Sequence, residues 1–299
     1  MINVIVSILE QGFIYGVMAL GVYISYSILD FPDLSVDGTF PLGAAICVTL
    51  SALGVNPWIS LILAFLAGCV AGAFTGFLNV KLKIRNLLCG ILTMTALYSI
   101  NYRIAGSATV FMNMTDKTIF TGLNHLLPKA ASGFSKLIVV FAIMLVAKFL
   151  LDWYLRTKSG FLLRSAGSNE GLVVTLAQNP GTIKIIGLAI SNGLVALAGA
   201  VNSQYTRQFS VGAGTGTVVM GLAAVIIGST IFKKIGFLRA TTGVLCGMVV
   251  YKACTYAALS SGLLPSDTNL IITVLFVVTL ILNEILSKKE KGLGVRRDA

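Results

Sequence analysis

Charged residues are scarce in this chain. They make up only 11% of the 299 residues, and aspartate and glutamate together number 11. Hydrophobic residues reach 56% and the mean hydropathy is +0.91, well outside the usual range of a soluble domain. Because so few charges cannot solvate the surface of a soluble protein of this size, the composition predicts an integral membrane protein.

Residues that carry most enzyme chemistry are also few. The single histidine, His125, lies in a polar connection, and none of the five cysteines belongs to a CxxC pair. This spacing matches neither a metal site nor a disulfide framework. The sequence also lacks a Walker phosphate loop, an HExxH helix and a nucleophile–base motif. We therefore expect a protein that is not an enzyme and that itself binds no metal or cofactor.

Apolar runs of about 17 to 25 residues fill most of the chain, a length that lets a helix cross roughly 30 Å of hydrocarbon. None of these runs alternates like the strand of a membrane β-barrel. The first run lacks a basic leader and a cleavage site, which favours a retained helix over a signal peptide. The sequence thus predicts a single all-α transmembrane domain over 1–299, with about nine spans and eight or ten as alternatives. The predicted spans are 4–28, 37–53, 57–80, 86–104, 135–156, 183–204, 217–232, 237–258 and 268–286.

Lysine and arginine gather in four of the connections between these spans. By the positive-inside rule, these connections face the cytoplasm, and nine spans satisfy that rule with the N-terminus outside and the C-terminus inside. The net charge of +11 then reflects topology and contact with anionic lipid headgroups, and it requires no nucleic-acid partner. The basic sets are Lys81, Lys83 and Arg85; Arg156, Lys158 and Arg164; Lys233, Lys234 and Arg239; and a basic cytoplasmic tail over 287–299.

Two polar segments interrupt the apolar runs. The stretch SILDFPDLSVDGTFP (27–41) holds three carboxylates and two prolines, and SQYTRQFSVGAGTGT (203–217) holds a glycine-rich run. Irregular backbone at membrane depth is tolerated only where it is buried in protein or lines a wet cavity. We therefore predict broken helices near 30–41 and 205–217. For the first segment the alternative is a plain cytoplasmic turn, in which Asp33 or Ser35 caps the next helix.

The surroundings of the two interruptions match. Residues 12–45 and 184–224 each contain a span rich in small residues, a polar break and a shorter apolar segment. In the predicted topology they run in opposite directions, as do the inverted repeats of many transporters. Polar groups in lipid tend to face a pathway or one another; Lys252 is the most costly of them, although its stem can reach toward the interface. The residues predicted to line a translocation pathway are Tyr26, Asp30, Asp33, Asp37, Asn192, Asn202 and Gln204.

The segment LLRSAGSNEGLVVTLAQNPGT (162–182) is polar and lies between two apolar runs. Ser168 or Asn169 can cap a short helix here, with Glu170 in its first turn and Asn179 before a Pro-Gly stop. Its apolar residues form a face that nothing in the loop covers, which favours docking into a partner's groove. A helix lying in the membrane interface is the alternative. The face consists of Leu172, Val173, Leu176 and Ala177.

Most of the chain resembles the branched-chain amino acid permease family of ABC importers, which also includes ribose and nucleoside permeases. The resemblance lies in three stretches and in their order. One departure is Gly171-Leu172-Val173, where family members often have an acidic residue and two alanines. The three stretches are IYGVMALGVYISYSILDFPDLSVDGTF near the N-terminus, FLLRSAGSNEGLVVTLAQNPGTIKIIGLAISNGLVALAGAVNSQY (161–205) and GLAAVIIGSTIFKKIGFLRATTGVLCG (221–247).

The resemblance implies a multi-pass permease subunit in the bacterial cytoplasmic membrane. It further implies a second permease copy, a separate ATPase that binds ATP and Mg, and an extracytoplasmic substrate-binding protein. The variant LSVDGTFP is more similar to the subgroup associated with amino acids, including aromatic ones, than to the sugar permeases. A coupling helix over about 167–180 would dock onto the ATPase through Gly167, Ser168, Asn169, Glu170, Leu172, Val173, Leu176, Ala177 and Asn179.

The residues alone leave two other classes of function open. An ion-coupled secondary transporter would use the acids at 30–37 and Lys252 as coupling groups. A membrane scaffold that transports nothing would need none of the intramembrane polar groups.

Overall fold

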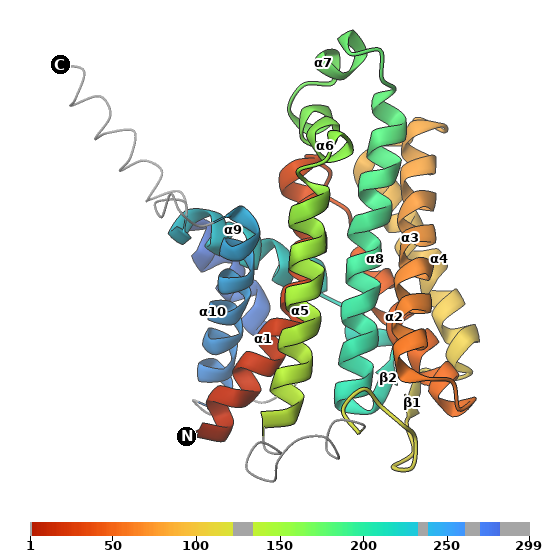
Figure 1. The fold of residues 1–299 in the computed structure, drawn as a ribbon, viewed down its shortest axis with the longest axis vertical. Coiled ribbons are helices and arrows are strands. Elements are labelled where there is room, and N and C mark those ends of the chain that lie inside the picture. The colour runs from red at the N-terminus through yellow and green to blue at the C-terminus, as the bar shows by residue number, and fades with distance from the viewer. Residues whose placement is uncertain (1, 122–133, 233–238, 261–269, 282–299) are drawn as a thin grey trace, which may run out of the picture.

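The computed structural model describes residues 2–121, 134–232, 239–260 and 270–281, and almost all of its regular structure is helical (Figure 1). Seven of the described helices are long and apolar enough to cross a membrane, and two shorter apolar helices occupy Val36–Ala52 and Leu270–Ile281. Each of the nine predicted spans therefore coincides with a helix. The basic tail over 287–299, His125, Lys233 and Lys234 lie outside the described residues.

The elements follow one another in a simple order. The first helix continues without interruption into a wider π-helical turn, and two short strands are the sole sheet in the described part of the chain. The elements are α1 (Ile2–Val22), π-helix η1 (Tyr23–Ile28), α2 (Val36–Ala52), α3 (Pro57–Val80), α4 (Asn86–Ala105), β1 (Thr109–Phe111), α5 (Ser135–Tyr154), α6 (Lys158–Ser168), α7 (Glu170–Thr175), α8 (Pro180–Thr206), β2 (Gln208–Ser210), 3-10 helix η4 (Val211–Gly214), α9 (Thr217–Phe232) and α10 (Ala240–Ser260).

The two ends of the bundle differ in what they carry. Figure 1 shows α7 projecting beyond the long helices at one end, with α6 beside the start of α8, whereas the N-terminus and the β1–β2 ribbon lie at the other end. In that ribbon Thr109 pairs with Ser210, antiparallel. Helices α1 and α8 consequently run in opposite directions, as predicted for the two matching segments. We call the end that carries α6 and α7 the loop end.

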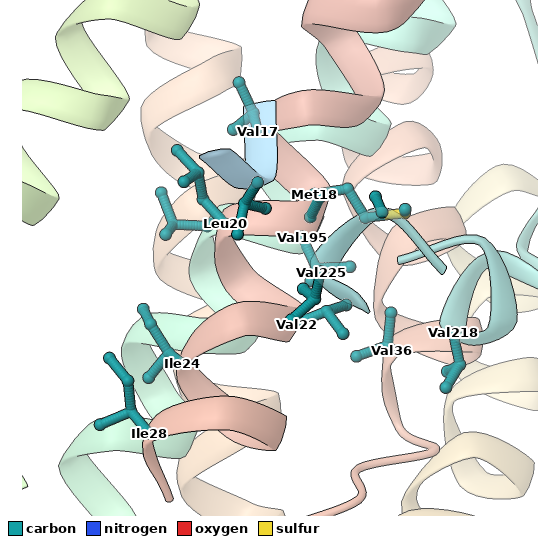
Figure 2. Close-up of a cluster of buried hydrophobic side chains, with 14 of the residues drawn as sticks. Val17, Met18, Leu20, Val22, Ile24, Ile28, Val36, Val195, Val218 and Val225 are labelled. Atoms are coloured by element: carbon teal, nitrogen blue, oxygen red, sulfur yellow. The ribbon is translucent and has the colours of Figure 1, made fainter. Parts of the chain in front are cut away.

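A buried apolar cluster holds the two matching segments together. Figure 2 shows side chains of α1, η1, α2, α8 and α9 converging, among them Met18, Val36, Val195 and Val225. Lipid is as apolar as these side chains, so close fit rather than hydrophobic drive holds such helices together.

Glycines bring α8 into backbone contact with α2 and α3. A methyl group added at Gly199 would lie 1.9 Å from the Phe40 carbonyl oxygen, and one added at Gly72 would lie 2.1 Å from the Leu188 carbonyl oxygen. No real side chain tolerates such distances. These contacts form a seam, the glycine seam, along which α8 packs without intervening side chains.

Both predicted helix breaks are present, but the first is shorter than expected. Chain 29–35 is non-helical, whereas Gly38 and Pro41 lie inside α2. The prediction of a break as far as residue 41 is therefore wrong at its end. Pro41 leaves the carbonyl of Asp37 without a helix partner. This carbonyl packs against Gly214, where an added methyl group would lie 1.9 Å from the oxygen.

Candidate translocation site and coupling loop

The carboxylate of Asp37 joins the two broken segments. Its Oδ1 accepts hydrogen bonds from the Thr217 hydroxyl and the Val218 N–H, both at 2.8 Å, and its Oδ2 accepts one from the Gly216 N–H at 3.1 Å. Asp37 itself lies in the first turn of α2. One negative charge thus lies at the N-termini of two helices, where the positive ends of both helix dipoles stabilise it.

A second polar cluster anchors the first break to the middle of α8. Asp33 is only 4% exposed. One carboxylate oxygen accepts from the Asn192 side-chain amide at 2.8 Å, and the other accepts from the Ser35 N–H at 2.8 Å. The Asn192 carbonyl oxygen in turn accepts from the hydroxyls of Thr39 at 2.7 Å and Ser35 at 3.1 Å. Every buried polar group here has a partner, which is how such a network becomes stable in a low-dielectric interior.

This cluster lies deep in the bundle. Asn192 is twelve residues into α8, which places it about 18 Å along the helix from the loop end. That distance is roughly half the thickness of a bilayer with its headgroups. The plain-turn alternative for residues 27–41 is wrong, because the segment enters the bundle, where Asp33 bonds to α8 and Asp37 bonds to α9.

The other predicted pathway residues lie elsewhere. The side chain of Gln204 donates to Cys47 Sγ at 3.0 Å and to the Pro57 carbonyl at 3.4 Å, and it accepts from the Ile119 N–H at 2.8 Å. It therefore ties α8 to the outer connections near the ribbon. Asn202 is half-buried in the same part of α8, and Tyr26 lies on η1 with its ring partly exposed. The pathway roles of these residues stay predictions.

Asp30 lies beside α6 rather than beside Asp33. It lines a polar cavity of about 270 Å³ together with Tyr23 and Ser27 of η1 and Arg164 of α6. Its φ of +51° is in the left-handed region, which aspartate adopts more readily than most residues. The first break therefore has one acid beside α6 and another bound to Asn192 in the middle of α8.

The predicted coupling helix over 167–180 is shorter than expected and is preceded by a separate helix. Gly167 and Ser168 end α6, and α7 covers only six residues, Glu170–Thr175. Asn169, one of the two residues predicted as the cap, caps α7 and accepts a hydrogen bond from the Leu172 N–H at 3.3 Å. Asn179 does not stop α7; it caps α8, where its side chain accepts from the Gly181 N–H at 2.9 Å.

Helix α7 is fixed to the bundle on one side and open on the other. The Glu170 carboxylate pairs with Lys184 of α8, and Val173 is completely buried in the main core. The prediction that Val173 belongs to the uncovered apolar face is therefore wrong. Leu172 and Leu176 are 45% and 48% exposed, and Ala177 is exposed with a φ of +54°. Val174, which the sequence analysis left out, is also exposed.

Comparison with known proteins identifies the family. The model of the branched-chain amino acid transport system / permease component matches residues 4–284. The chain belongs to this family. The permease is therefore the membrane-spanning component of an ABC-type importer, a multi-pass protein of the bacterial inner membrane that works with an ATPase and a binding protein.

Individual relatives agree with this assignment. The permease is 41% identical to the tyrosine transport system permease protein of Clostridioides difficile over 92% of this chain and 90% of that one. It is 25% identical to the ribose import permease protein of Escherichia coli over 77% of this chain and 70% of that one. No solved structure matches.

Two buried charged residues of the permease were not among those predicted for the pathway or for docking. Asp152 near the end of α5 accepts from Lys148 at 3.0 Å, Arg239 at 2.9 Å and Thr241 at 2.7 Å, which ties α5 to α10. The i, i+4 spacing of Lys148 and Asp152 was the available signal. Lys252 of α10 is only 9% exposed. The sequence indicated that burying the charge of Lys252 in the membrane costs free energy, but it did not show which residues surround the side chain.

Proposed function

We propose that the permease forms the translocation pathway for a small polar solute, an amino acid with an aromatic or branched side chain. Two copies assemble, each bound to an ATPase subunit, and an extracytoplasmic binding protein delivers the solute. The tyrosine system of the 41% identical relative supports an amino acid over a sugar as the solute. ATP and Mg belong to the ATPase, and the permease itself binds no cofactor, catalyses no reaction and contacts no nucleic acid.

The observation that carries this proposal is the connection between α7 and the buried acids. α7 presents Leu172 and Leu176 outward, and its Glu170 is paired with Lys184 on α8. Eight residues further along α8, Asn192 holds Asp33. A movement of α7 imposed by a bound ATPase is therefore passed along one helix to the broken segment. Rocking of one repeat against the other is how such folds alternate access to a midplane site.

Membrane lipid is the remaining partner. A groove of about 570 Å³ runs between α3, α5 and α8 and is lined by apolar side chains, including Trp58 at one end and Tyr154 at the other. Aromatic residues at both ends of an apolar surface are typical of contact with the two interfaces of a bilayer.

The test is uptake by the assembled importer. The permease, its ATPase and its binding protein are reconstituted in vesicles, and uptake of labelled tyrosine, leucine and ribose is measured with and without ATP. We expect ATP-dependent uptake of an amino acid and no uptake of ribose. Uptake of ribose alone would contradict the proposed solute, and uptake without ATP would contradict the proposed mechanism.

A second candidate, an ion-coupled secondary transporter, is favoured by one observation, the buried carboxylate of Asp33. It predicts that the permease alone accumulates solute, that an ionophore abolishes accumulation and that ATP has no effect. The same vesicles without ATPase and binding protein distinguish the two mechanisms.

A further inference from the structure

Lys252 is a buried cation without an anionic partner in the described part of the chain. Its side chain is 9% exposed, and no carboxylate of the described residues lies within ion-pair distance of it. Its ammonium instead lies 3.5 Å from the centroid of the Tyr15 ring. A cation over an aromatic face recovers only part of the hydration that an ammonium loses on burial.

An unpaired lysine at this depth is unusual. Charged side chains within membrane spans normally pair with one another or face a wet cavity, and they mark substrate or ion pathways. Lys252 is twelve residues into α10, as Asn192 is into α8, so both lie about 18 Å from the loop-end starts of their helices. The two helices do not start level, however, because Gly21 of α1 meets the Ser191 carbonyl of α8, whereas Gly12 of α1 meets Val249 of α10. Lys252 therefore lies inside the bundle but nearer the ribbon end than the Asp33 cluster.

The neighbours of Lys252 are aromatic. The Tyr15 ring stacks on the Phe40 ring, with centroids 5.6 Å apart and planes at 16°. Phe40 follows Thr39, whose hydroxyl bonds to Asn192, so the backbone of α2 connects the stacked rings to the polar cluster. α1 and α10 are held close here, because a methyl group added at Gly16 would lie 2.9 Å from a Leu245 methyl group.

We propose that Lys252, Tyr15 and Phe40 form the permease's recognition site for an amino acid with an aromatic side chain. The ammonium of Lys252 binds the carboxylate of the solute. The Tyr15 ring, backed by the fully buried Phe40, packs against the side chain of the solute. The site therefore requires a carboxylate, which a neutral sugar lacks. This inference rests on the proposed function, since it needs an amino acid as the solute.

Three substitutions in the reconstituted importer test the proposal. Lys252→Met and Lys252→Gln remove the charge and are expected to lower tyrosine uptake by about tenfold or more, the effect of losing one charge-assisted contact. Lys252→Arg keeps the charge and is expected to retain uptake within about threefold, because arginine also binds carboxylates. Co-purification of the ATPase shows whether each of the three variants still assembles.

Thermal stability separates recognition from a structural role. Removing a buried, unpaired ammonium lifts a desolvation penalty, so Lys252→Met is expected to raise the unfolding temperature of the detergent-purified complex while uptake falls. The matched control is Lys148→Met, which removes a lysine of α5 that is paired with Asp152. That variant is expected to lower the unfolding temperature and to keep uptake.

The outcomes are distinct. Wild-type uptake in Lys252→Met, or loss of assembly in all three variants, would overturn the recognition site while leaving the proposed function standing. A wild-type importer that carries ribose and no amino acid would overturn the proposed function, and the site with it. Reduced uptake with raised stability in Lys252→Met, together with retained uptake in Lys252→Arg, supports both.

Discussion

The Val218 N–H donates a 2.8 Å hydrogen bond to the carboxylate of Asp37, a residue 181 positions earlier in the chain. This contact joins the starts of α2 and α9, the helices that follow the two breaks. The helix starts that follow the two breaks, one in each of the oppositely directed segments, thus meet at the side chain of Asp37. We call this contact between the two breaks the Asp37 joint.

Removing the charge of this joint is expected to destabilise the permease. Asp37→Asn loses charge-assisted bonds to the N-terminus of α9, at a cost of about 1 to 2 kcal/mol. Thermal unfolding in detergent measures the effect. Asp30→Asn, at the exposed acid of the same break, is the matched control and is expected to be neutral. Equal unfolding temperatures for the two variants would contradict the stabilising role of Asp37.

The coupling between Asp33 and Asn192 is expected to be strong. Either residue changed to alanine leaves a buried polar group without its partner, which costs about 1 to 3 kcal/mol. The double variant is expected to lose less stability than the two single variants together. A double-mutant cycle on unfolding free energy measures this, and strict additivity would show that the 2.8 Å contact contributes nothing.

The glycine seam is expected to reject even one methyl group. Gly199→Ala places a carbon against the Phe40 carbonyl, and the helices must separate or the fold is lost. We expect a sharp fall in the yield of folded protein from detergent extraction, measured by gel filtration. Gly212→Ala is the control, because its added methyl group would meet nothing closer than the Ser210 hydroxyl at 3.9 Å. Equal yields would mean that the seam opens at little cost.

Docking of the ATPase is expected to depend on the open face of α7. Leu172→Asp and Leu176→Asp place a charge in an apolar interface, and both are expected to abolish co-purification of the ATPase while membrane insertion stays intact. The exposed Gln178→Asp is the control and is expected to co-purify. Val173→Asp is expected to differ from both, because burying a charge in the core lowers the yield of the permease itself. Normal association of both leucine variants would refute the docking surface.

Much of the fold was predictable because membrane spans follow from length and hydrophobicity. The positions of the helices and the existence of two breaks are confirmed. The end of the first break was missed because Pro41 and Gly38 usually interrupt helices, whereas here a glycine of η4 packs on the carbonyl that Pro41 leaves without a helix partner. That contact comes from a residue far away in the sequence.

The candidate site was only partly predictable. Composition identified the acids at 30–37 and the polar residues of α8, but it did not pair Asp33 with Asn192 or Asp37 with α9. Helical spacing predicted that Val173 lies on the exposed face of α7. Because α7 is short and is held against α8, spacing alone does not determine which of its side chains are buried. The pairing of side chains depends on how helices cross, which local patterns do not encode.

Helix α8 is continuous over 27 residues, or about 40 Å, and the glycine seam grips it along its middle. With backbone pressed against backbone there, sliding is obstructed and tilting is the freer motion. A rod that tilts about its middle moves its two ends in opposite senses. Lys184, near α7, and Gln204, near the ribbon, then move in opposite directions. In the proposed mechanism, a passage that widens at one face of the membrane therefore narrows at the other.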